Sequence, residues 1–147
     1  MMVRLVLALM MLSTAAFAMP TTQRFVLAAG ANDGGADRVR LRYAVSDAGN
    51  FAAVMGQMGG VDPDNRVLLA EPDRAGFVDA LHELGKRLEQ VPPTVRSEVL
   101  VYYSGHADET GLLLAGERLT YRELRAQLDD IGADVRIAIL DACASGA

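Results

Sequence analysis

The stretch SEVLVYYSGH, residues 97–106, decides how the chain is expected to fold. Its first seven residues, 97–103, are almost continuously apolar, as is typical of a β-strand buried on both faces of a sheet. Ser104, Gly105 and His106 follow directly. In α/β sheets the chemistry lies beyond the carboxyl ends of the strands, so His106 is a candidate functional residue in the loop after this strand.

Three further apolar runs have the same character and are expected to form strands. They lie at residues 24–30, 66–70 and 135–140. Helical patterns separate the first three strands. Residues 43–58 have small and apolar side chains at helical spacing and predict a first helix. A second helix is predicted by apolar residues that would share one helical face: Phe77, Leu81, Leu84, Leu88 and Val91. The prolines at 92 and 93 are expected to end this second helix.

A hairpin and a third helix are expected before the last strand. Residues 111–120 predict a small hairpin that turns at Ala115 and Gly116. Thr120 and Glu123 have the spacing of a capping box, and Gly132 is expected to close the helix that follows. The complete order is strand, helix, strand, helix, strand, hairpin, helix, strand, which predicts an α/β fold with a mostly parallel sheet and helices on both faces.

Composition limits the class of protein. The chain has 147 residues, which suits one domain, and 51% of them are apolar, so a sizeable core is available. The net charge is −5 and no basic run is present. Because a phosphate polyanion requires clusters of Lys and Arg, nucleic acid is not expected as a partner.

Residues 1–18 have the pattern of a secretory signal peptide. Arg4 precedes an apolar stretch at 5–12, and Ala16 and Ala18 form an A-x-A site before Met19. A transmembrane anchor is the alternative, but spanning takes about 20 apolar residues. We therefore expect a domain at 19–147 that is exported to the periplasm or the extracellular space and is not held in a membrane once the signal is removed.

The only cysteine, Cys143, follows the last apolar run as His106 follows the third one. If the two strands are neighbours, the imidazole can take the thiol proton and the thiolate can attack an acyl carbon. Backbone N–H groups would then stabilise the oxyanion. Alternatives for Cys143 are an inert buried thiol and an intermolecular disulfide. A metal site is not expected, because two histidines and one thiol lie far apart in the sequence.

Two segments resemble those of a known family. YYSGHADETG (102–111) resembles the Y-S-G-H-G segment of caspase-like cysteine peptidases, and ILDACASG (139–146) resembles the D-x-C-x-S-G segment of metacaspases and bacterial caspase-family proteins. The resemblance covers about residues 24–146. It implies a caspase-like three-layer sandwich. The family fold continues beyond the nucleophile with further strands, so the domain is expected to be truncated and its sheet incomplete at the C-terminal end.

The resemblance also implies roles for individual residues. Cys143 would be the nucleophile and His106 the general base and acid. The backbone N–H groups of Cys143 and Ala107 would form the oxyanion hole, although the family usually has glycine where this chain has Ala107. Asp141 would line the pocket for the residue before the cleaved bond and favour Arg or Lys there. Its alternative role is to cap the strand-to-loop turn.

The expected function is therefore that of an exported thiol protease, a cysteine-type endopeptidase of the peptidase C14 type. It would act on a peptide or protein substrate, possess a Cys143–His106 dyad and require no cofactor. One alternative is a catalytically inactive caspase-like domain that serves as a protein-interaction module. Another is a different thiol hydrolase or acyltransferase on the same scaffold.

Overall fold

Four parallel strands form the centre of the protein, which a computed structural model describes over residues 21–142. The strands are β1 (Thr22–Ala31), β2 (Arg66–Ala70), β3 (Arg96–Ala107) and β6 (Val135–Asp141), in the spatial order β2-β1-β3-β6. An antiparallel hairpin, β4 (Gly111–Leu114) and β5 (Glu117–Thr120), pairs with the end of β3. The sheet is therefore mixed, with six strands among the described residues.

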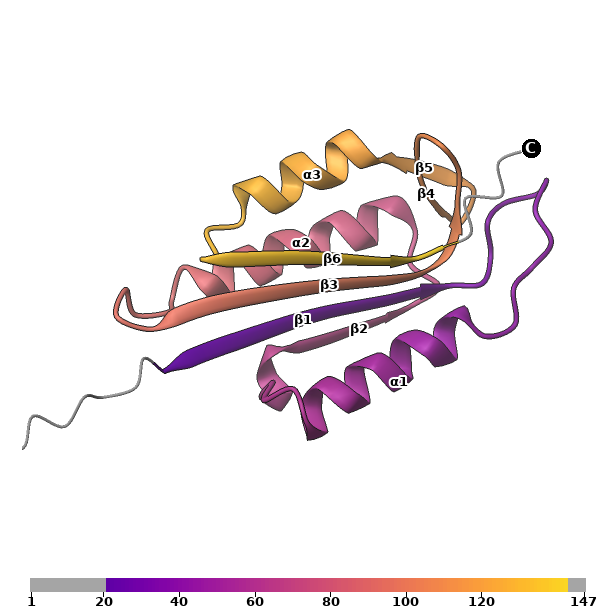
Figure 1. Cartoon of the computed structure of the whole chain (residues 1–147). Helices are drawn as coiled ribbons and strands as arrows, with labels where there is room; N and C mark the ends of the chain where they lie inside the picture. Colours follow the sequence, from indigo (N-terminus) through magenta and orange to yellow (C-terminus); the bar gives the residue numbers. More distant parts are fainter. Residues whose placement is uncertain (1–20, 143–147) are drawn as a thin grey trace, which may run out of the picture.

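Three helices cover the sheet. Helix α1 (Ala44–Gln57) lies on one face, and α2 (Arg74–Leu88) and α3 (Tyr121–Asp130) lie on the other (Figure 1). A short 3₁₀ turn, Pro63–Asn65, precedes β2. The expected α/β class, the order of the elements and the placement of helices on both faces are confirmed. The signal peptide expected at residues 1–18 lies outside the described residues.

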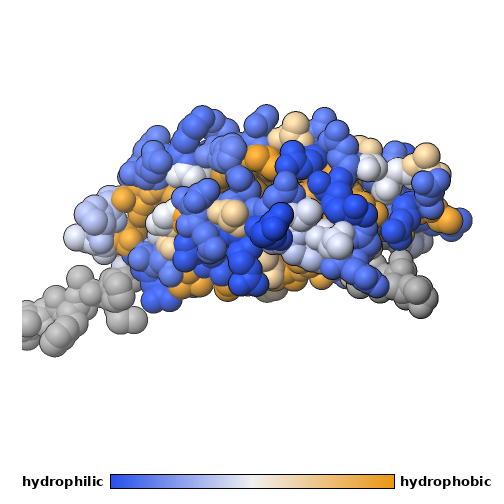
Figure 2. Space-filling model, turned by 90° about the horizontal axis from the view of Figure 1, so that it is seen from above, coloured by the Kyte–Doolittle hydropathy of each residue, from blue (hydrophilic) through white to orange (hydrophobic). Residues whose placement is uncertain are grey.

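The core has two parts, one on each face. The larger lies beneath α2 and α3, where Phe77 contacts Tyr103 edge-to-face with ring centroids 6.4 Å apart. The smaller lies beneath α1, where Phe51 stacks on Tyr102 at 4.3 Å. Seen from the α3 side, the surface is largely hydrophilic with apolar side chains between the polar ones (Figure 2). Strands β1 and β3 are thus buried on both faces, as their apolar runs predict.

Local sequence signals are confirmed at the hairpin and at the start of α3. Ala115 and Gly116 both have positive φ, at 50° and 85°, as tight hairpin turns require. The Thr120–Glu123 capping box is complete, with both reciprocal hydrogen bonds present. The prediction for Gly132 is wrong: α3 ends with the N–H of Ile131 donating to Leu128, and Gly132 does not take positive φ.

Other boundaries also differ from expectation. Helix α2 ends at Leu88, so Val91 lies in the turn that follows it rather than in the helix. Strand β3 continues to Ala107, so His106 lies within the strand and not in a loop. The physical reason is the hairpin, because Leu112 and Leu113 of β4 pair with Ala107 and His106.

Strand β6 is less buried than its sequence predicts. Among the described residues it pairs only with β3. Ile137, Ile139 and Leu140 are 43%, 38% and 37% exposed. An apolar run therefore lies along an open edge of the sheet, and the expectation that this strand is buried on both faces is wrong.

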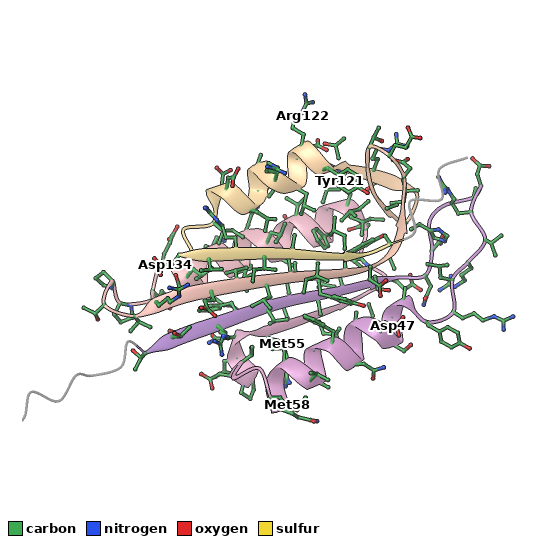
Figure 3. All side chains as sticks on the ribbon, in the orientation of Figure 1. Asp47, Met55, Met58, Tyr121, Arg122 and Asp134 are labelled. Carbon is green, nitrogen blue, oxygen red and sulfur yellow. The ribbon has the colours of Figure 1, made fainter. Side chains whose placement is uncertain are left out.

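Asp134 directly precedes β6 and connects it to the start of β3 (Figure 3). Its Oδ2 accepts hydrogen bonds from the Ser97 backbone N–H at 2.8 Å and from the Ser97 hydroxyl at 3.1 Å. Its own N–H lies 3.2 Å from Ser97 Oγ. The hydrogen bonds from Ser97 hold the pKa of Asp134 below its usual value.

This lowered pKa predicts an acid-dependent loss of stability. A carboxyl whose pKa falls on folding stabilises the protein above the unfolded value, near 3.8, and loses that contribution as the pH drops through the lower folded value. We expect the melting temperature of Asp134→Asn to fall less steeply than that of the wild type below about pH 5. Asp130→Asn, which removes an exposed carboxylate on α3, is the control. Equal slopes in all three proteins would contradict the prediction.

Candidate active site

His106 is held near the carboxyl end of β3 by the hairpin and by a buried tyrosine. The Tyr103 hydroxyl lies 2.8 Å from the carbonyl oxygens of both His106 and Leu113 and donates its one hydrogen to this pair. Burial raises the pKa of Tyr103 well above its usual value, so the hydroxyl stays a donor. Because side chains alternate along a strand, His106 lies on the same face as Tyr102 and Ser104, which is the α1 face.

The imidazole ring of His106 makes one hydrogen bond that decides its chemistry. Nε2 lies 2.9 Å from the carbonyl oxygen of Val39, in the loop between β1 and α1. A carbonyl oxygen can only accept, so Nε2 carries the hydrogen and, in the neutral ring, Nδ1 is the basic nitrogen. The same loop packs against the ring at Gly34, where an added Cβ would lie 2.4 Å from the ring Cδ2.

A cavity of about 350 Å³ lies beside His106, between the end of the sheet and the start of α1. It is lined by Leu41, Arg42, Tyr43, Ala44, Asp47, Ser104, Gly105, His106 and Asp141. His106 and Asp141, which the sequence proposed separately, therefore line the same cavity. The register of the sheet explains this, because β3 and β6 are parallel and Ser104 pairs with Asp141.

Asp141 is held by a hydrogen bond from a tyrosine, and the turn that it was alternatively expected to cap lies outside the described residues. The Tyr102 hydroxyl donates to Asp141 Oδ2 at 3.0 Å, and the ring of Tyr102 is fixed by its stacking on Phe51. Burial, together with the carboxylate of Asp141, raises the pKa of Tyr102. The tyrosine consequently remains a protonated donor and orients the carboxylate at the rim of the cavity.

Asp47 is a second carboxylate at the cavity and was not identified from the sequence. It lies in the first turn of α1, at the end of the sheet where the parallel strands finish (Figure 3). A signal was present, because helices that follow parallel strands begin at the carboxyl ends of those strands. Polar side chains in the first turn of the 44–57 helix therefore belong to the same end of the molecule as His106.

Ala107, proposed as an oxyanion-hole residue, is the last residue of β3 and is buried. It does not require positive φ, so alanine in place of the family's glycine carries no backbone strain. The N–H of Asp108 donates to Gly111. Because hydrogen-bonded and non-hydrogen-bonded pairs alternate in an antiparallel ladder, the Ala107–Leu112 pair is of the second kind, and the N–H of Ala107 is not donated to β4.

Cys143 was proposed both as the nucleophile and as the second oxyanion donor. It lies outside the described residues. The described chain ends one residue earlier, at Ala142. Within residues 21–142 no cluster of three or more His, Cys, Asp or Glu is suited to hold a metal ion. In the same range, no helix has the length and apolar character needed to cross a membrane.

A larger cavity, of about 650 Å³, lies at the opposite end of the sheet. It is formed by the starts of β1 and β2 and the end of α2, and its lining includes Gln23, Asn65 and Gln90 but no histidine. The smaller cavity contains the imidazole and both carboxylates, so we assign the candidate site there. Its lining places the imidazole of His106 beside two carboxylates and the guanidinium of Arg42.

Comparison with known proteins does not assign the chain to a family. No protein-family model matches it, and a search of curated proteins gave no match.

Proposed function

We propose that the protein is a cysteine endopeptidase of the caspase-like superfamily, with Cys143 as nucleophile and His106 as general base and acid. The observation that carries the proposal is the register of β3 and β6. Ser104 pairs with Asp141, and in the sequence His106 and Cys143 each follow two residues later. The last residue of β6 thus lies beside the strand that carries His106, and only one residue separates it from Cys143 in the sequence, which supports the pairing of the two as a dyad.

In the proposed mechanism, Nδ1 of His106 takes the proton from the Cys143 thiol. The thiolate forms a bond to the substrate carbonyl carbon, and the backbone N–H groups of Cys143 and Ala107 stabilise the oxyanion. The imidazolium then gives its proton to the leaving amine as the peptide bond breaks. Water, deprotonated by the same imidazole, hydrolyses the thioester and restores the thiol. These steps need no cofactor.

The cavity favours a basic residue before the cleaved bond. Asp47 and Asp141 both line it, and Asp141 is oriented by Tyr102. Carboxylates form charge-assisted hydrogen bonds with guanidinium and ammonium groups, and Arg can bind two acceptors at once. The two carboxylates of the cavity, with the single guanidinium of Arg42 beside them, therefore support cleavage after Arg or Lys, as the family resemblance does.

A panel of fluorogenic peptides that differ only in the residue before the bond tests this specificity. We expect cleavage after Arg and Lys and little after Asp. Because a hydrogen bond to a charged group contributes about 1.5–3 kcal/mol, Asp47→Asn and Asp141→Asn should each lower kcat/KM for the Arg peptide by about 10- to 100-fold. The loss for a peptide with a neutral residue should be small.

One control variant completes the panel. The Cys143→Ala variant measures hydrolysis that does not depend on the thiol. A preference for Asp over Arg in the wild type, or unchanged Arg cleavage in both carboxylate variants, would contradict the assignment of the pocket.

A protein-interaction module is the second candidate function. It is favoured by the exposed apolar side chains along β6, Ile137, Ile139 and Leu140. Such a module would not require His106 to activate a thiol, so the reactivity of Cys143 separates the two functions.

A further inference from the structure

We propose that Glu71 is the positioning residue that fixes the orientation and tautomer of His106, and that it acts through the loop between β1 and α1. This inference rests on the proposed function for its catalytic meaning, but its geometry is independent of Cys143. Glu71 follows β2 directly and lies outside the cavity lining.

The carboxylate of Glu71 binds both sides of this loop. Oε2 accepts hydrogen bonds from the backbone N–H groups of Asn32, at 2.9 Å, and Asp33, at 3.2 Å. Oε1 forms an ion pair with Arg40 at 2.7 Å. One side chain thus joins the residues that begin the loop to a residue seven positions further along, and it adds to the backbone hydrogen bond from the Leu41 N–H to the Asn32 carbonyl at 2.9 Å.

This loop contains two groups that lie against the imidazole of His106. The Val39 carbonyl, which accepts from Nε2, is adjacent to Arg40, and Gly34, which packs against the ring, is adjacent to Asp33. The side chain of Val39 is 86% exposed, so its packing cannot hold the carbonyl in place. The position of this acceptor depends instead on the hydrogen bonds that tie down the loop.

The backbone of Glu71 directs its side chain toward the loop. Its N–H donates to the carbonyl of Gly30 at the end of β1, at 2.8 Å. Its φ is 51°, in the left-handed region that glycine adopts freely and that other residues seldom occupy. Glycine would suit this backbone conformation better than glutamate. Both carboxylate oxygens of Glu71 bind residues of the loop, and this interaction is a reason for glutamate at this position.

If the loop moves, His106 loses the acceptor for Nε2–H. The ring can then rotate, and the hydrogen can move to Nδ1, which is the nitrogen that must be free to act as base. Glu71 would therefore influence catalysis without touching substrate or the reacting atoms.

Nuclear magnetic resonance of the histidine rings in the full chain tests this proposal. The chain has two histidines, and the second, His82, is exposed on α2 and serves as an internal reference. Spectra would be recorded at about pH 8, where an unperturbed imidazole is neutral. In the wild type we expect His106 to carry its hydrogen on Nε2, with slow exchange against water, and His82 to exchange rapidly.

The main variant is Glu71→Gly, which removes the carboxylate and suits the left-handed backbone. We expect its His106 Nε2–H to exchange about tenfold faster or more, as loss of one hydrogen bond predicts, while His82 is unchanged. Glu109→Gly, which removes an exposed glutamate near the hairpin, should behave as the wild type. An unchanged His106 signal in Glu71→Gly, or a hydrogen on Nδ1 in the wild type, would overturn the proposal.

Arg40→Ala provides a second variant if Glu71→Gly proves unfolded by circular dichroism. The Arg40 side chain is 66% exposed, so its removal does not disturb the core. It should accelerate exchange at His106, and Arg40→Lys should restore slow exchange. No acceleration in a folded Arg40→Ala would count against the proposal in the same way.

The ring measurements are separable from peptidase activity, because they can be repeated in Cys143→Ala. Absence of peptide cleavage together with the expected ring signals would reject the proposed function and leave the role of Glu71 intact. If cleavage is observed, Glu71→Gly should lower kcat about tenfold and change KM little, as expected for a residue that orients a general base. A change in KM alone would place Glu71 in substrate binding and overturn the positioning role.

Discussion

The His106→Ala variant is expected to lose about 10³-fold in kcat/KM toward an Arg peptide, because general acid–base catalysis contributes about 10²- to 10⁴-fold. The side chain lies near the end of β3 beside the cavity, hydrogen bonds to the Val39 carbonyl, and belongs to neither part of the core. Its removal therefore leaves both parts of the core intact, and the loss would reflect chemistry rather than unfolding.

Alkylation of Cys143 provides the second measurement for this variant. A thiol beside an imidazole should react with iodoacetamide at neutral pH faster than a plain thiol, which is about 3% ionised there, and His106→Ala should remove the excess. The matched control is His82→Ala, which deletes an exposed histidine on α2 and should retain both activity and alkylation. Equal alkylation rates in all three proteins, with no cleavage, would favour the interaction module.

The Gly30→Ala variant is expected to lower the free energy of unfolding by about 2–3 kcal/mol, in the upper part of the range of about 1–3 kcal/mol for overpacking a close-packed contact. Gly30 lies near the end of β1, directly beneath the start of α1. An added Cβ would lie 2.4 Å from the carbonyl oxygen of Ala44 and 2.5 Å from the Cα of Val45. Both are backbone atoms of α1, so the whole helix would have to move.

Gly49→Ala is the control for this substitution and should change stability in the opposite direction. Gly49 lies within α1, and an added Cβ there meets no atom within 4 Å. Because alanine favours a helix over glycine, this variant should gain about 0.5–1 kcal/mol. Urea unfolding of both variants measures the difference. A Gly30→Ala protein as stable as the wild type would show that α1 is not held against β1 as closely as described.

Much of the fold was predictable from local patterns. The apolar runs gave the strands β1, β2, β3 and β6, and the turn at Ala115–Gly116 and the box at Thr120–Glu123 were each read from a few adjacent residues. These signals succeed because turn chemistry and capping depend on neighbours in the sequence. The alternation of strands and helices then limited the topology to a parallel sheet.

Features that depend on distant residues were not predictable in the same way. Whether β6 is central or at an edge depends on which strand lies beside it, and its apolar run gives no indication of that. The extension of β3 through His106 requires pairing with β4. Asp47 was recognised only as part of a helix, because its approach to Asp141 depends on how α1 is placed on the sheet.

The supports of His106 were the least accessible to sequence analysis. The Val39 carbonyl is a backbone group, which every residue has, so nothing in the sequence distinguishes it. Glu71 acts on a loop 31 to 39 residues away in the chain. Pairing of the parallel strands β3 and β6, by contrast, was the condition for the candidate dyad, and the register shows it for every described residue of β6.

The open flank of β6 has a consequence for how the molecule behaves in solution. Within residues 21–142 no strand pairs with the outer side of β6, and a strand edge that bears isoleucine and leucine is a template onto which another extended segment can add. Among the described residues, the strand that sets the register of the candidate site is therefore also the one best suited to accept an added strand.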